Sequence, residues 1–83
     1  MYTYKPKGVC STSISFNITN NIISDIVFEG GCDGNLKGLS SLANGMSCAD
    51  VIARLEGIRC GKRRTSCPDQ LVQAIKHFQT PEF

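Results

Sequence analysis

The five cysteines are the residues of this chain best suited to chemistry, and two of them border a basic segment. Cys67 follows Cys60 by seven positions, within the sequence Ser66-Cys67-Pro68-Asp69. Ser66 and Asp69 form a capping-box pattern with Asp in place of Glu, and apolar residues at helical spacing follow. We therefore expect Cys67 at a helix N-terminus, where free amide groups and the helix dipole favour a thiolate. A thiolate can serve as a metal ligand or as a nucleophile.

Four basic residues surround this pair of cysteines: Arg59, Lys62, Arg63 and Arg64. They push a nearby thiol further toward the thiolate form. Around a metal held by four thiolates they could offset the excess negative charge, and beside a helix N-terminus they could bind a phosphate-bearing ligand. The plain alternative is that they keep an exposed loop soluble.

Length, charge and cysteine usage limit the possible classes. The 83 residues suit one domain, 1–83, of a size at which folding buries only about 60% of the extended chain's surface. A net charge of +2 does not point to nucleic acid. No signal peptide or membrane span is visible, so we expect a cytoplasmic protein with reduced thiols. Five cysteines cannot all pair, so metal ligation is favoured over disulfides, redox pairs or inert buried thiols.

The N-terminal half carries the period of β-strands. Residues Ser13–Ile18 alternate between polar and apolar types, and a second β-rich run, Ile22–Glu29, follows the turn residues Thr19–Asn21. The two runs predict an antiparallel hairpin, and Tyr2–Lys5 could add a short edge strand to it.

The apolar residues of this hairpin are assigned to two faces. One face is expected to carry Ile14, Phe16, Ile18, Ile26 and Phe28, and the other Ile23 and Val27. Cys10 and Cys32 lie at similar distances from the turn, so antiparallel pairing should bring both to the open end of the hairpin.

Three helices are expected to follow. The first spans 35–43, with a stripe of Leu36, Leu39 and Leu42 and a stop at Gly45. The second begins at Ser47, whose partner Asp50 completes another capping pattern, and ends at Gly57. The third runs from Ser66 to Phe78 and is limited by Pro81.

The string Thr65-Ser66-Cys67-Pro68-Asp69 is the signature that names the TSCPD domain, and nearly the whole chain resembles that small family. Further matches are the segments 8–11, 31–38 and 57–61. The resemblance implies that the characteristic cysteines are Cys10, Cys32, Cys60 and Cys67, whereas Cys48 does not match.

A domain related to this family occurs at the C-terminus of adenosylcobalamin-dependent ribonucleotide reductases. Stand-alone members therefore often carry a ribonucleoside-diphosphate reductase label. A chain of 83 residues lacks room for the barrel, radical cofactor and nucleotide site of such an oxidoreductase. The resemblance thus implies an accessory module that works with a ribonucleotide reductase or another protein, rather than a complete catalyst.

The layout is also similar to U-type iron–sulfur scaffold proteins, with Cys10, Cys32 and Cys67 at the three ligand positions. Two differences stand out. Thr12 replaces the acidic residue of that family, and Cys60 is an addition. A closed site of four thiolates would hold its metal more firmly than a cluster-transfer site.

The other polar residues have simpler interpretations. We expect Cys48 to be a partly buried residue in a first helical turn and His77 to face solvent. Asp33 and Asp69 fit loop and capping positions, and no acid–base pair or nucleophilic triad is apparent.

The sequence predicts an α+β domain, in which an antiparallel hairpin or small sheet is followed by about three helices and the sulfurs meet at one end of the sheet. The predicted function is binding of a metal by Cys10, Cys32, Cys60 and Cys67, with zinc favoured and an iron–sulfur cluster as the alternative. Two other classes stay open. One is a redox module of a ribonucleotide reductase system that uses Cys60 and Cys67 as a dithiol, and the other is a structural interaction domain. No nucleic acid or membrane partner is expected.

Overall fold

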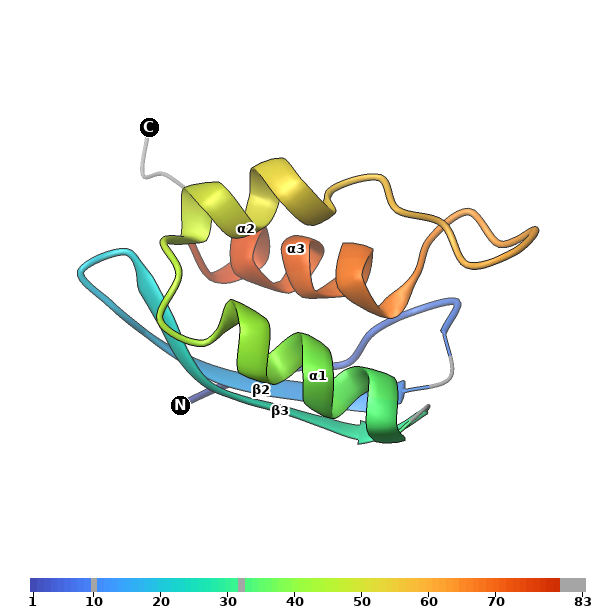
Figure 1. The fold of residues 1–83 in the computed structure, drawn as a ribbon, viewed down its shortest axis with the longest axis horizontal. Helices are drawn as coiled ribbons and strands as arrows, with labels where there is room; N and C mark the ends of the chain where they lie inside the picture. The colour runs from blue at the N-terminus through green and yellow to red at the C-terminus, as the bar shows by residue number, and fades with distance from the viewer. Residues whose placement is uncertain (10, 32, 80–83) are drawn as a thin grey trace.

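The fold is a three-stranded sheet with helices on one side. The computed structural model describes residues 1–9, 11–31 and 33–79. Its elements are, in order, β1 (Tyr2–Tyr4), β2 (Ser11–Thr19), β3 (Ile22–Gly30), α1 (Asp33–Ala43), α2 (Cys48–Leu55) and α3 (Cys67–Phe78). The strands are antiparallel in the order β1-β2-β3, and the helices lie over the sheet with α2 beside α3 (Figure 1). The predicted α+β fold is confirmed, including the edge strand near the N-terminus.

A tight turn sets the hairpin of β2 and β3. Thr19 pairs with Ile22, which leaves Asn20 and Asn21 as the two loop residues. Both have positive φ, 51° and 64°, as a type I′ turn requires, and Asn tolerates this left-handed conformation better than most residues. The predicted hairpin therefore follows from the Asn-Asn pair.

A bulge in β3 corrects one prediction about the faces of the sheet. Ser15 pairs with Val27 but Asn17 pairs with Ser24, so β3 carries one extra residue between them. Asp25 lies in this stretch with a φ of 53°. The extra residue reverses the alternation, so Ile23 is fully buried on the same face as Ile26. The assignment of Ile23 to the opposite face is wrong. Val27 is exposed, which agrees with its assignment to that face.

The core lies between this face of the sheet and the helices. Its largest fully buried side chains are Phe16, Ile14, Ile23, Leu71, Ile75, Val51 and Val72. Leu36 and Ala43 are also buried, seven residues apart on α1, and Leu39 is half-buried. Leu42 is 79% exposed, so its assignment to the buried stripe is wrong. Seven residues make about two helical turns, so Leu36 and Ala43 lie on the same face of α1. Leu42, one position before Ala43, lies outside that face.

The predicted helix starts are confirmed in their capping contacts. The Ser47 hydroxyl accepts a hydrogen bond from the Asp50 amide at 3.1 Å, and Ser66 does the same for the Asp69 amide at 3.1 Å. Gly57 follows the end of α2 with a φ of 83°, which suits a glycine cap. The predicted stop at Pro81 lies outside the described residues.

Candidate functional site

Cys67 is the first residue of α3, as the sequence predicts. Its position is fixed by Ser66, which is 3% exposed and whose hydroxyl donates to the Ile58 carbonyl at 2.6 Å while capping the helix. The Cys67 side chain is half-buried. A capped helix thus presents a thiol at its N-terminal end, beside amide groups that favour negative charge.

Cys60 lies in a turn that folds back toward the start of α3. Its amide donates to the Thr65 carbonyl at 3.1 Å, and the Arg63 amide donates to the Cys60 carbonyl at 3.0 Å. Gly61 has a φ of 58°, a left-handed conformation that glycine adopts without strain. These contacts close the loop from 60 to 65 and bring an exposed cysteine beside the residues that precede Cys67.

The two cysteines line the same hollow. It has a volume of about 280 Å³ and lies between the start of α1, the segment after α2 and the start of α3. Its walls are largely apolar, and its lining residues are Asn35, Leu36, Leu39, Ile58, Arg59, Cys60, Ser66, Cys67 and Pro68. The structure therefore brings Cys60 and Cys67 together in one site, which we call the thiol hollow.

The open end of the hairpin reaches the thiol hollow through Ser11. The Ser11 hydroxyl lies 3.3 Å from the Cys67 sulfur, and Ser11 pairs with Gly30 across the sheet. Ser11 directly follows Cys10, and Gly30 precedes Cys32 by two residues. Cys10 and Cys32 lie outside the described residues, so the convergence of all four sulfurs stays a prediction.

The described residues supply two thiols to this site. Within 1–9, 11–31 and 33–79, no group of three or more His, Cys, Asp or Glu residues is placed to hold a metal ion. The described donors match thiolate coordination in chemical type. A complete set of four requires the two cysteines outside those ranges.

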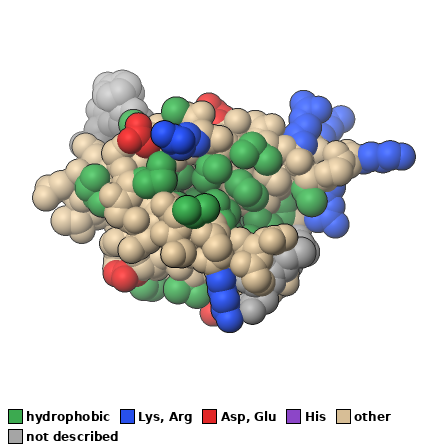
Figure 2. All heavy atoms as spheres, in the orientation of Figure 1, with side chains coloured by type: hydrophobic (Ala, Val, Ile, Leu, Met, Phe, Trp, Pro, Cys, Tyr) green, Lys and Arg blue, Asp and Glu red, His purple; other side chains and the backbone are tan. Residues whose placement is uncertain are grey.

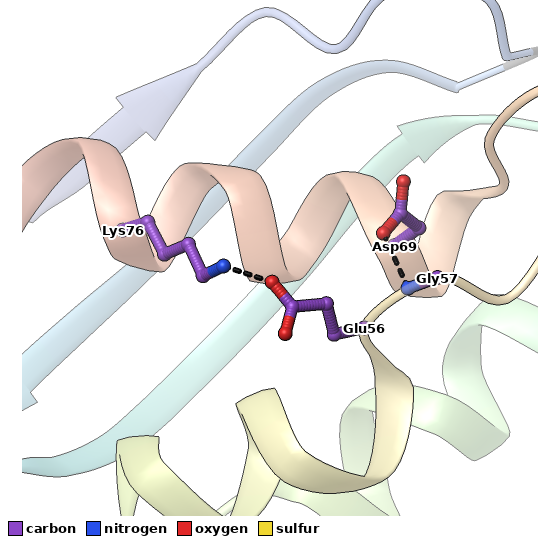
Figure 3. A network of polar contacts seen from close by, with 4 residues as sticks. All are labelled: Glu56, Gly57, Asp69 and Lys76. Atoms are coloured by element: carbon purple, nitrogen blue, oxygen red, sulfur yellow. Dashed lines mark hydrogen bonds and ion pairs between the residues drawn. The ribbon is translucent and has the colours of Figure 1, made fainter.

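Asp69 has a structural role that its capping pattern only partly predicts. Its two carboxylate oxygens accept hydrogen bonds from the Gly57 amide at 2.8 Å and from the Thr65 hydroxyl at 2.5 Å. It thereby ties both ends of the loop from 57 to 65 to α3, and an ion pair of Lys76 with Glu56 joins α2 and α3 further along (Figure 3). The loop that carries Cys60 is thus anchored at each end.

The environment of Asp69 favours its charged form. The residue is 8% exposed. Burial on its own would raise the pKa of Asp69. Hydrogen bonds from Thr65, Gly57 and Gln73, together with the charge of Lys76, outweigh burial, so the net pKa lies below the usual value. Sequence reasoning identified the cap but not this loop anchor. The sequence feature that could have indicated this anchor is Thr65, whose hydroxyl lies four residues before Asp69 and can donate to its carboxylate.

The four basic residues of the loop are all exposed. Arg59 borders the thiol hollow, and the Arg63 guanidinium is 3.5 Å from the Gly8 carbonyl oxygen. Figure 2 shows Lys and Arg side chains projecting at this end of the molecule. Their predicted roles in charge balance or anion binding stay predictions.

Cys48 and His77 lie away from the thiol hollow. Cys48 is 1% exposed within the core, and burial raises the pKa of the Cys48 thiol. It is therefore a packing residue, as expected. His77 is exposed, with its ring 5.7 Å from that of Tyr4.

The fold and site define a small α+β domain with a thiol-lined hollow at one end of its sheet. The TSCPD domain model matches residues 2–79, so the chain belongs to the TSCPD domain family. Neither the curated proteins nor the solved structures yielded a match. The family and the several cysteines are consistent with a small metal-binding domain. Among the described residues, no helix has the length and apolar character needed to cross a membrane.

Proposed function

We propose that this domain binds a metal ion through Cys10, Cys32, Cys60 and Cys67, with zinc as the favoured metal. The observation that carries the proposal is the thiol hollow, where Cys60 and Cys67 share one apolar lining. Cys67 is held there by a capped helix, and Cys60 by a closed and anchored turn. The start of α3 and the turn at Cys60 therefore each contribute one thiol to the thiol hollow.

The chain neighbours of the other two ligands support their inclusion. Consecutive Cα atoms are about 3.8 Å apart, which limits how far Cys10 can lie from Ser11. The Ser11 hydroxyl is itself 3.3 Å from the Cys67 sulfur. Cys32 lies one residue before α1, and Asn35 and Leu36 in the first turns of α1 line the thiol hollow.

Four thiolates suit Zn²⁺, which prefers a closed tetrahedral set in structural sites. Apolar walls would limit the access of water, and Arg59 at the rim would offset part of the negative charge. A bound metal would also add folding free energy to a small core. An iron–sulfur cluster is the alternative occupant. It is less favoured as a transferable cluster, because Thr12 stands where an acidic residue would be needed and donates to the Glu29 carbonyl at 3.1 Å.

The partner is proposed from the family resemblance alone. A domain of this size would serve as an accessory module to a ribonucleotide reductase, with the metal holding the shape of a docking surface rather than taking part in catalysis. Co-purification with a reductase subunit, and its loss on removal of the metal, is the result expected.

The second candidate is a redox dithiol formed by Cys60 and Cys67. The observation that favours it is that both thiols line the thiol hollow, where Cys60 is exposed and Cys67 is half-buried. Loss of two electrons and two protons to an oxidised dithiol partner would form a Cys60–Cys67 disulfide and reduce that partner's disulfide.

Metal analysis of anaerobically purified protein separates these functions. The metal-binding proposal expects about one zinc per chain and no titratable thiols in the folded protein, because four cysteines would be ligands and Cys48 is buried. Colourless protein would favour zinc, and a brown colour an iron–sulfur cluster. Metal-free protein that forms a reversible Cys60–Cys67 disulfide would instead support the redox role.

A matched pair of variants controls for general effects of cysteine removal. Cys67→Ser should lose the metal, whereas Cys48→Ala should retain it, because Cys48 packs within the core. Equal retention in both variants would overturn the assignment of Cys67 as a ligand.

A further inference from the structure

A second hollow lies on the face formed by α1 and α2. Its volume is about 490 Å³. Ala43 and Val51 are buried at its floor, and Leu39, Met46 and Leu55 are half-buried in its walls. Figure 2 shows hydrophobic side chains gathered over these helices in the middle of the face. We call this the helix groove.

Leu42 lines the helix groove, and its side chain is exposed to solvent. This side chain is 79% exposed, the highest value among the large hydrophobic residues that the structure describes. A single exposed leucine is ordinary on a protein surface. Here a projecting apolar side chain and an apolar hollow lie next to each other, so two copies of this face would complement one another in shape.

Two charged residues at the rim carry opposite signs. Asp50 and Arg54 lie one turn apart on α2, line the helix groove and are exposed. Within the described part of the chain, neither side chain takes part in an ion pair. Both charges are therefore available to a partner.

We propose that the helix groove is the interface of a symmetric homodimer. In a two-fold interface each residue contact occurs twice, so Asp50 of one copy meets Arg54 of the other and the reverse. Leu42 of each copy enters the helix groove of its partner. A face that bears both an acid and a base is complementary to itself, whereas an acidic or a basic partner would match only half of it. The proposal does not depend on metal binding.

Sedimentation equilibrium tests this interface by charge reversal. The wild type should dimerise with a dissociation constant below about 1 mM, the range in which association is measurable at practical concentrations. Asp50→Arg and Arg54→Asp should each weaken the dimer at least about tenfold, because like charges would face each other twice. An equimolar mixture of the two variants should form a heterodimer within about threefold of the wild-type affinity, since both contacts are attractive again.

Leu42→Glu should abolish the dimer without unfolding the chain, because the side chain is already exposed. Circular dichroism of each variant checks that the fold is retained. The proposal is overturned if the wild type is monomeric at about 1 mM, which would leave the groove to a different partner. It is also overturned if a wild-type dimer survives all three substitutions, or if mixing the two reversals restores no association.

Discussion

Replacing Asp69 by Asn tests whether the loop that carries Cys60 is held by a buried carboxylate. The change keeps the size of the side chain and removes its charge. The Asp69 carboxylate accepts hydrogen bonds from the Gly57 amide and the Thr65 hydroxyl, with a further contribution from the Gln73 side chain. An Asn side chain has one oxygen, so one of the two donors loses its acceptor.

The expected loss follows from the number and type of bonds. A hydrogen bond to a charged group contributes about 1.5–3 kcal/mol, and one such bond is lost while the other weakens. We expect a decrease of about 2–3 kcal/mol in the free energy of unfolding at pH 7. At about 4–8 °C per kcal/mol for a domain of this size, the midpoint of thermal unfolding should fall by roughly 8–24 °C.

The pH dependence follows from the lowered pKa of Asp69. A carboxyl whose pKa is lower in the folded state stabilises the fold above its unfolded value of about 3.9, and this contribution is lost as pH falls through the folded pKa. The difference between wild type and Asp69→Asn should therefore be constant from pH 7 to about 5 and shrink below about 4. Urea unfolding of both proteins at each pH measures it.

Asp50→Asn is the matched control, because Asp50 occupies the same position in the first turn of α2 but is exposed. Its cost should stay within about 0.3–1 kcal/mol, the value of a charge near a helix N-terminus. Equal costs for the two substitutions, or a difference at Asp69 that grows in acid, would refute the reasoning.

Three further predictions concern the fold and are measured by denaturant unfolding. Ile23→Thr should destabilise by about 2–3 kcal/mol and Val27→Thr by less than about 0.5 kcal/mol, because the bulge buries only the former; similar costs would contradict the bulge. Asn21→Val should cost about 1–2 kcal/mol, since a β-branched residue resists a φ of 64°, and a neutral result would argue against the two-residue turn. Phe16→Ala should cost about 3–5 kcal/mol by opening a cavity in the core, and a cost below about 1 kcal/mol would place Phe16 outside it.

Local sequence signals predicted most of the fold. Ser47 and Ser66 marked the helix starts because their hydroxyls satisfy amides within the next turn, a contact that needs only neighbouring residues. Asn20 and Asn21 indicated the hairpin turn because Asn itself tolerates the positive φ that the turn requires. Features that depend on one residue and its near neighbours can thus be predicted from the chain.

The missed features depend on distant parts of the chain. The bulge at Asp25 is supported by Asn44, whose side-chain oxygen accepts from the Asp25 amide at 3.1 Å across 19 positions. Leu42 was placed in a buried stripe by spacing alone, although the packing of α1 is set by Leu36 and Ala43 against other elements. No local pattern encodes either contact.

The candidate site was predicted in part. The sequence identified Cys67 at a helix start and Cys60 as its companion, and the structure places both in one hollow. It did not predict the apolar walls supplied by α1, or the anchoring of the loop by Asp69. Both depend on how helices pack after the chain has folded.

X-ray absorption at the zinc edge of the zinc-loaded wild type tests the central claim most directly. Four thiolate ligands predict a first shell of four sulfur atoms at about 2.3 Å from the metal. Cys67→Ser should fail to hold zinc. A first shell made mainly of nitrogen or oxygen at about 2.0–2.2 Å, or a wild-type protein that retains no zinc, would contradict the account.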